Sequence, residues 1–343
     1  MLVAELRTDL WVYAAIFAYV ALSSFVLMSF GLFRSQALFA YLPNWMPTFG
    51  IFIPAGLLIL EFLWAWTRQI RQPDEAARSV LSRNRVARLF AGICLMMAIG
   101  LFMGAFTSFK SSLAVMRGGF PHDIWLANFD QWLHFGLDPS NVLVSCCNNS
   151  EFLRYIDIFY SNLWMIIVFC GLFIVASMPY FSRIRFRFIL LFIVTWILGG
   201  NVFAFLGLSA GPVFFENITG DGARFMPVTA MLASAGDTGL MANLFQTILW
   251  RSYSQGGTGM GVGISAFPSM HVASAMLVAC FAMEFNRVSA MIGAVFMLLT
   301  LFSSVYLGWH YAVDGYFSIL LVLALYLICC KFFPTGSNFV PTG

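Results

Sequence analysis

SAFPSMH (residues 265–271) and GWHYAVD (residues 308–314) bracket the stretch of this 343-residue chain that decides its fold. Between them lie two apolar runs, separated by a short polar break at Asn286-Arg287. This pattern predicts a hairpin that leaves one side of a membrane, turns, and returns to the same side. We therefore expect His271 and His310, two of only four histidines in the chain, to end on one side at one depth.

Composition extends the membrane prediction to the whole chain. It is 61% hydrophobic and 10% charged, whereas soluble domains carry about 25% charged residues. The predicted class is an all-α, polytopic integral membrane bundle of about eight transmembrane helices, because lipid-exposed backbone must satisfy its own hydrogen bonds and these runs do not alternate like barrel strands. The expected spans are 10–33, 49–67, 87–109, 155–178, 187–208, 270–285 (a short one), 289–308 and 310–332.

The spans predict a division of the chain and an orientation. We expect two accessory transmembrane helices and a cytoplasmic loop in residues 1–86, a six-helix core in 87–333, and a disordered tail in 334–343. Loops 68–88 and 179–187 hold more than half of the arginines. The positive-inside rule then places both termini in the cytoplasm and the two histidines on the periplasmic or lumenal face. The absence of sorting motifs favours a bacterial inner membrane.

Two long loops on the predicted outer side, 110–154 and 209–264, are rich in aromatic residues. In the first, apolar positions 125, 129, 132 and 133 recur at helical spacing, which predicts an interfacial amphipathic helix. The second holds SAGP at 209–212, another amphipathic stretch at about 225–250, and a glycine-rich run. Such loops suit a substrate with a lipid part, and simple packing of the loops against the bundle explains the same composition equally well.

The chemistry-bearing residues lie at the two open ends of the hairpin. His310 and Asp314 are four residues apart on the expected last helix, so they share a face, and a carboxylate beside an imidazole makes its other nitrogen a better nucleophile. His271 begins the sixth helix after Pro268, a residue tolerated in a first helical turn. The free N–H groups at 269–271 favour a bound anion, with Ser269 and Met270 among its expected ligands.

Together these residues predict phosphoryl transfer. We expect His310 to attack phosphorus, and His271 to protonate the leaving oxygen and then activate the incoming water or alcohol. A single histidine at a membrane interface more often packs than catalyses, so the prediction depends on the combination. Cations must neutralise the phosphate charge. The candidates are Lys110, Arg117, Arg224 and Arg251. We expect no metal and no other cofactor, because no carboxylate cluster offers a metal cage.

At these positions the sequence resembles the type 2 phosphatidic acid phosphatase superfamily, whose histidine mechanism is shared with vanadium haloperoxidases. PSMH at 268–271 is similar to the second signature of that superfamily, Pro-Ser-Gly-His, with methionine for glycine. Residues 303–314 are similar to the third, Ser-Arg-x5-His-x3-Asp, with Ser304 in place of the arginine. Residues 110–118 are similar to the first, Lys-x6-Arg-Pro, with Gly118 in place of the proline.

The resemblance is closest to the branch that includes inositol phosphorylceramide synthase and bacterial relatives, on residues 209–212, 268–273 and 308–315. It covers about 200–325, extends from about 105, and leaves the first two spans outside. The missing third-signature arginine matters because its bidentate fork is hard to replace at a phosphate. We expect Arg224 or Arg251 to replace it.

The predicted function is a lipid-phosphate phosphatase that acts through a phosphohistidine on the outer face. One alternative is a phosphotransferase that passes a head group to an alcohol such as ceramide or a glycan. Another is a transporter or scaffold with decayed catalytic residues, although the residues of the site are present and no inverted pair of broken helices is evident. The expected partners are a lipid phosphate, membrane lipids and, for the transferase, a lipid alcohol acceptor, with no nucleic acid.

Overall fold

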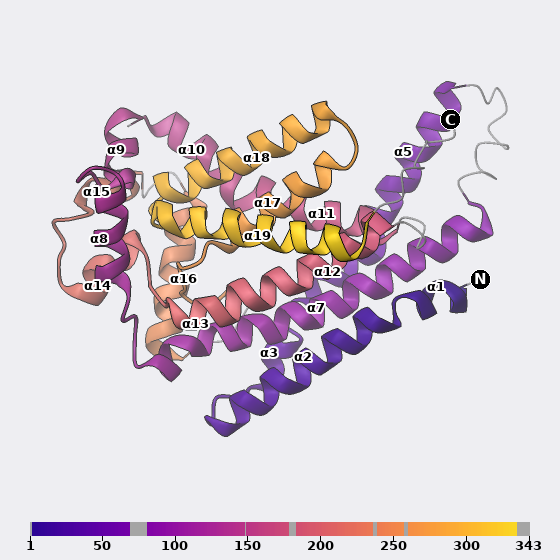
Figure 1. Ribbon diagram of the computed structural model, residues 1–343, viewed down its shortest axis with the longest axis horizontal. Helices are drawn as coiled ribbons and strands as arrows, with labels where there is room; N and C mark the ends of the chain where they lie inside the picture. The colour runs from indigo at the N-terminus through magenta and orange to yellow at the C-terminus, as the bar shows by residue number, and fades with distance from the viewer. Residues whose placement is uncertain are drawn as a thin grey trace.

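The structure, a computed structural model, describes residues 2–68, 81–147, 149–177, 183–235, 239–256 and 260–334. All regular elements in these ranges are helical, which confirms the all-α class (Figure 1). Seven helices are long and apolar enough to cross a membrane, so the chain is a multi-pass membrane protein. They are Leu10–Ser29, Ser35–Thr67, Arg83–Arg117, Ser150–Ala176, Ile184–Leu206, Arg287–Tyr306 and Ala312–Phe332. The eighth expected span is the shorter apolar helix Met270–Met283.

The long helices pack together in one bundle. The bundle contains α2 (Leu10–Ser29), α5 (Ile53–Arg68), α7 (Arg83–Arg117), α11 (Trp164–Ala176), α12 (Arg183–Ile197), α17 (Met270–Met283), α18 (Arg287–Tyr306) and α19 (Ala312–Phe332). The helix α7 is the most buried of the seven candidate spans, and α2 lies along it. The short α17 packs against both α18 and α19, which completes the predicted hairpin.

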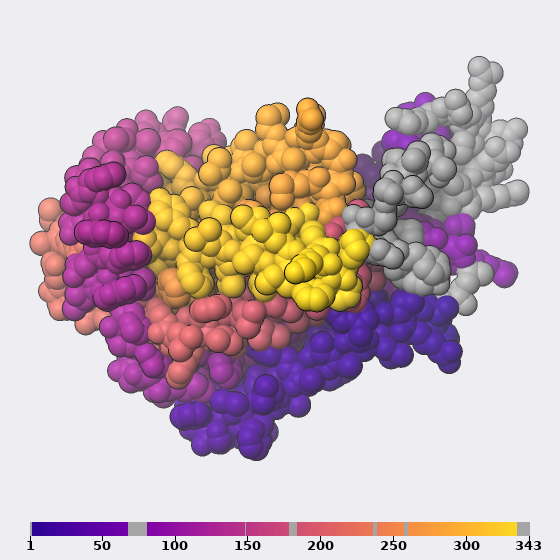
Figure 2. Space-filling view, viewed as in Figure 1, coloured from indigo at the N-terminus to yellow at the C-terminus, as the bar shows by residue number. Residues whose placement is uncertain are grey.

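Short helices cover one end of the bundle (Figures 1 and 2). They are α8 (Asp123–Leu133), α9 (Pro139–Cys146), α14 (Phe215–Thr219), α15 (Met226–Ser234) and α16 (Met241–Gln255). The helix α8 confirms the predicted amphipathic helix. Its buried side holds Asp123 and Asp130, while Trp125, Phe129 and Trp132 stack along its exposed side.

The remaining short elements connect or interrupt the spans. They are α1 (Leu2–Thr8), α3 (Ser35–Leu38), α4 (Leu42–Pro47), α10 (Ser150–Ile158), α13 (Ala204–Leu206), η4 (Pro212–Phe214), and the π-helical η1 (Thr48–Phe52), η2 (Phe159–Leu163) and η3 (Leu198–Phe203). Each π-helical turn continues an α-helix, and such turns often mark functional sites. In this chain η2 contributes Tyr160 and Ser161 to the cavity described below.

Ion pairs hold the opposite end of the bundle. Asp9 accepts two hydrogen bonds from the Arg185 guanidinium, at 2.7 and 2.8 Å, and both side chains are buried. Further pairs join Glu61 to Arg85, Glu284 to Arg187 and Glu5 to Arg88. Glu61, which lies in the second span, is therefore a hydrogen-bonded structural acid. The same arginines that mark the predicted cytoplasmic side also join helices that are distant in sequence.

Candidate active site

A cavity of about 290 Å³ lies inside the bundle beside the α17–α18–α19 hairpin. Its polar side chains include Lys110 from α7, His271 from α17, and His310 from the loop before α19. The structure thus brings together three of the residues that the sequence predicts for the site. Most of the remaining wall is apolar, with Trp45, Met103, Phe106, Tyr160, Trp164, Met165, Phe169, Trp196, Phe214, Phe245, Leu249 and Met260.

His310 has a defined tautomer. Its Nδ1 lies 2.7 Å from the Ala266 carbonyl oxygen, which can only accept, so Nδ1 carries the hydrogen and donates it. The lone pair is therefore on Nε2. Burial and, to a smaller extent, the nearby positive charge of Lys110 lower the pKa of His310 to about 3, and the hydrogen bond to the Ala266 carbonyl partly opposes this change. The imidazole is consequently neutral near pH 7, the form in which Nε2 is a nucleophile.

Asp314 lies near His310 Nδ1 but is not its nearest partner. The carboxylate Oδ2 is 3.6 Å from His310 Nδ1, farther than the Ala266 carbonyl. The same Oδ2 accepts the Tyr311 N–H at 2.9 Å. Oδ1 has no hydrogen-bond partner in the part of the chain that the structure describes. The expected histidine–carboxylate contact is therefore longer than a hydrogen bond, and the orientation of His310 depends first on a backbone oxygen.

His271 is held by stacking. Its ring lies 4.3 Å from the Tyr160 ring and 4.1 Å from the Trp164 ring, centroid to centroid. Trp164 Nε1 also donates to the His271 carbonyl at 3.0 Å. Neither imidazole nitrogen of His271 has a hydrogen-bond partner within the described ranges. Sequence reasoning missed both aromatic residues, although their spacing of four on one span places them on one helix face.

The N-terminus of α17 offers two unpaired backbone donors. Ser269 is the N-cap, and its Oγ accepts the Val272 N–H at 3.4 Å. Among the described residues, no acceptor bonds the N–H of Met270 or of His271. Met270 lines the cavity, whereas Ser269 is fully buried outside its wall. An anion at this helix end would meet the two N–H groups and the positive end of the helix dipole.

Lys110 is the one predicted cation that the structure places at the cavity. Arg117 lies seven residues farther along α7, about 10 Å away along the axis, where its Nη2 is 3.2 Å from His122 Nε2. Arg251 is exposed on α16 and donates to Gln255 at 3.0 Å. Neither arginine lines the cavity.

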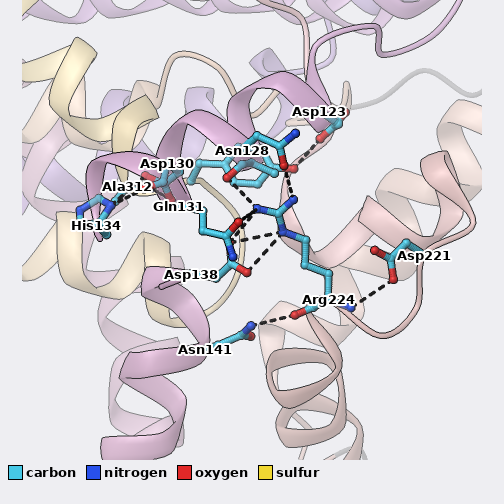
Figure 3. Close-up of polar contacts among 12 residues, drawn as sticks. Asp123, Asn128, Asp130, Gln131, His134, Asp138, Asn141, Asp221, Arg224 and Ala312 are labelled. Atoms are coloured by element: carbon cyan, nitrogen blue, oxygen red, sulfur yellow. Dashed lines mark hydrogen bonds and ion pairs between the residues drawn. The ribbon is translucent and has the colours of Figure 1, made fainter. Parts of the chain in front are cut away.

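Arg224 is engaged elsewhere (Figure 3). Its guanidinium pairs with Asp138 at 3.0 Å and donates to Asn128 Oδ1 at 2.7 Å and to the Ala127 carbonyl at 2.8 Å. These bonds join the loop before α15 to α8 and to the loop that follows it. The structure does not bring Arg224 or Arg251 to the position expected of a replacement for the missing arginine.

Ser304, which occupies the place of that arginine, supports the loop that carries His310. Its hydroxyl donates to the Leu301 carbonyl at 2.8 Å and is buried within α18. Its own carbonyl accepts the N–H groups of Trp309 and His310. The arginine position has therefore become a backbone support in this chain.

The SAGP stretch at 209–212 joins the two histidine-bearing loops. The Ser209 carbonyl accepts the Ala266 N–H at 2.8 Å, next to the oxygen that orients His310. Gly211 has φ +94°, and a Cβ there would lie 2.5 Å from the Trp309 carbonyl oxygen, so only glycine fits. The stretch is thus a positioning element of the site, a role that its sequence alone did not reveal.

The Asp123 carboxylate, at the start of α8, is hydrogen-bonded to this stretch. It accepts the N–H groups of Ala210 and Gly211, at 2.7 and 2.9 Å, and the Tyr311 hydroxyl at 2.9 Å. Burial raises the pKa of Asp123 to about 6, and these three donors partly oppose that rise. The two loops and α8 therefore share one buried carboxyl group.

These parts can perform phosphoryl transfer. The cavity presents a nucleophilic nitrogen, a second imidazole, an ammonium group and two backbone N–H donors. Across the described residues, no group of three or more histidine, cysteine, aspartate or glutamate side chains is arranged to hold a metal ion.

The sequence profile of the PAP2 superfamily matches residues 124–328, more than half of the chain. The matched region contains His271, His310 and Asp314, and it begins after Lys110. No curated protein and no solved structure shows a significant match.

Proposed function

Because the chain belongs to the PAP2 superfamily, we propose that it cleaves a lipid phosphate through a covalent phosphohistidine at His310. Members of this superfamily are phosphatases or phosphotransferases, so the family supports an enzyme over a transporter or scaffold. One observation carries the assignment of the nucleophile. The bond from His310 Nδ1 to the Ala266 carbonyl leaves the Nε2 lone pair free, on a residue that shares a cavity with His271 and Lys110.

In the first step, His310 Nε2 attacks phosphorus as the bond to the lipid oxygen breaks. His271, which takes up a proton when the anionic phosphate binds beside it, gives that proton to the leaving oxygen, which departs as an alcohol. Lys110 and the N–H groups of Met270 and His271 bind the phosphoryl oxygens, where charge develops. Asp314 stabilises the positive charge that the His310 ring acquires.

In the second step, water attacks the phosphohistidine and His271 takes its proton. The phosphorus–nitrogen bond breaks, inorganic phosphate leaves, and both imidazoles return to their starting forms. A lipid alcohol in place of water would give transfer of the phosphoryl or phospho-head group instead. The resemblance to the inositol phosphorylceramide synthase branch is the reason to keep this phosphotransferase as the second candidate. Hydrolysis, with water as the acceptor, is the first.

The location proposed for this chemistry is the outer face of a bacterial inner membrane. Arg85 and Lys110 lie on one helix, 25 positions apart, which is roughly 38 Å along its axis. This length exceeds the hydrocarbon thickness of about 30 Å. The paired arginines therefore suit the cytoplasmic side, while the cavity suits the periplasmic side.

The test is phosphate release by the purified protein from phosphatidic acid and from an isoprenyl diphosphate, with and without ceramide or diacylglycerol. Release without an added alcohol, abolished in His310→Ala, would support the phosphatase. A new lipid product that forms only with the alcohol would support the transferase. Equal release by the wild type and by His310→Ala would refute a nucleophilic role for this residue. A chelator should leave the rate unchanged.

A further inference from the structure

The segment 35–52 lies outside the part of the chain that matches the superfamily, yet it reaches into the bundle. The surrounding helical stretch is only 11% buried, as expected for a lipid-facing accessory span. Three aromatic side chains of the segment are nevertheless buried, with Tyr41 and Trp45 each 7% exposed and Phe49 4%. Tyr41 and Trp45 line the same cavity as the two histidines.

Two glycines of α7 let this segment approach closely. A Cβ added at Gly104 would lie 2.1 Å from the Leu38 carbonyl oxygen, a distance that no side chain tolerates. One turn earlier, a Cβ at Gly100 would lie 3.1 Å from Leu42 and 3.3 Å from Trp45. The spacing of four puts both glycines on one face, as in close helix contacts within membranes. The surface of α7 is therefore shaped to receive the segment.

Tyr41 connects the segment to both sides of the cavity. Its hydroxyl is hydrogen-bonded to Thr107 Oγ1 at 2.8 Å and accepts the Gly261 N–H at 3.1 Å. Thr107 is three residues before Lys110 on α7, so the two side chains share a helix face. Gly261 belongs to the loop that precedes the catalytic hairpin. Tyr41 thus fixes the wall next to the phosphate-binding cation.

Trp45 lies at the other end of the cavity. Its ring is 5.1 Å from the Phe169 ring, centroid to centroid, and both rings line the cavity with Met103. Met103 is the lining residue of α7 farthest from Lys110, about 10 Å along the axis. The cavity therefore has a charged end at Lys110 and the histidines, and an apolar end at Trp45.

We infer that Trp45 is a specificity-determining residue and Tyr41 a positioning residue, and that the substrate is a lipid phosphate whose apolar chain runs from His310 toward Trp45. This inference rests on the proposed function for the identity of the head group. Trp45 closes the apolar end and limits the length of chain that fits, while Tyr41 holds the wall along which the chain lies. The segment 35–52 is then a part of the active site that the superfamily match does not cover.

The test compares lysophosphatidic acids with an octanoyl and a stearoyl chain. In Trp45→Ala, the ratio of kcat/KM for the long chain to that for the short chain should rise by roughly tenfold, because pocket contacts discriminate apolar groups to about this extent. Tyr41→Phe removes both hydrogen bonds of the hydroxyl, so it should lower kcat/KM for both chains by about fivefold or more and leave the ratio unchanged. The matched control is Trp66→Ala, which removes an exposed indole of α5.

A second measurement does not need turnover. A lipid phosphate with a diazirine at the chain end, photolysed on the His310→Ala protein, should label peptides that contain Trp45 or Phe169. Labelling of outer-loop peptides alone would overturn the inference, as would equal chain ratios in folded Trp45→Ala and Trp66→Ala. Failure of the proposed function would look different, because the wild type would then hydrolyse neither lipid faster than His310→Ala.

Discussion

The two ends of the bundle satisfy their buried acids in different ways. At the arginine-rich end, Asp9 and Glu284 meet guanidinium groups of other helices. At the cavity end, Asp123, Asp130 and Asp157 accept pairs of backbone N–H groups. A carboxylate that accepts backbone N–H groups fixes a helix end or a loop in place and needs no cation as a partner.

Because of this difference, the paired arginines contribute to stability, while an unpaired cation at the cavity is free for catalysis. Lys110 has no carboxylate partner among the residues that the structure describes, so its charge remains for a ligand. Arg224 is the exception at the cavity end, since it pairs with Asp138. We therefore expect substitutions at the arginine-rich end and at Arg224 to affect folding, and substitutions at the cavity to affect turnover.

The largest effect should come from His310→Ala. Loss of the nucleophile should lower phosphate release from phosphatidic acid at least about a thousandfold, as for other covalent catalysts. The thermal unfolding midpoint should change little, because the ring lines a cavity. The control is His122→Ala, a histidine at the same end that lines no part of the cavity. A rate near that of the wild type in His310→Ala would remove the phosphohistidine from the mechanism.

Next in size is the effect of Lys110→Met. The change keeps the length of the side chain and removes its charge, so kcat/KM should fall about a hundredfold, typical for the loss of one group that stabilises transition-state charge. Arg224→Met is the matched comparison. It should lower stability, because Asp138 loses its partner, and leave kcat/KM per folded molecule within about threefold. An equal loss in both variants would restore Arg224 as the replacement for the missing arginine.

Asp9→Asn tests the arginine-rich end of the bundle, where Asp9 pairs with Arg185. It leaves the buried Arg185 charge uncompensated, so the free energy of unfolding should fall by about 3 kcal/mol or more. Denaturant unfolding in detergent measures this loss. Phosphate release per folded molecule should stay close to that of the wild type. Glu151→Gln, at an exposed helix start, is the control and should cost less than about 1 kcal/mol. A similar cost in both variants would contradict the structural role of the buried pair.

The spans and the histidine pair were predictable because they depend on local patterns. The lengths of the apolar runs predicted all eight helices, including the short α17. Two interruptions of these runs drew attention to His271 and His310. Long-range partners leave no such signal. Nothing near position 266 marks its carbonyl as the partner of His310, because every residue has a carbonyl.

The aromatic residues and the arginines show the same limit. In a chain with 38 phenylalanines, no local feature separates Trp45 and Trp164, which line the cavity, from aromatic residues that face lipid. For Arg224, the sequence gives a charge and a predicted side of the membrane, but not the distant Asp138 that pairs with it. Charge alone therefore could not tell which of the four predicted cations lies at the cavity, where the structure places Lys110.

The smallest predicted effect concerns Asp123, the buried acid that joins residues 210 and 211 to Tyr311, the neighbour of His310. Its pKa is raised to about 6, against about 3.9 in an unfolded chain. The folded state therefore binds a proton more tightly than the unfolded state, so this stabilisation is complete below about pH 4 and is lost as the pH rises through about 6. The difference amounts to about 2–3 kcal/mol. Between pH 4 and pH 7, the unfolding free energy of the wild type should fall by this amount relative to that of Asp123→Asn, whose side chain at this position does not titrate. Parallel curves would show that the three donors hold Asp123 ionised throughout, and that this end, like the other, is organised around a full negative charge.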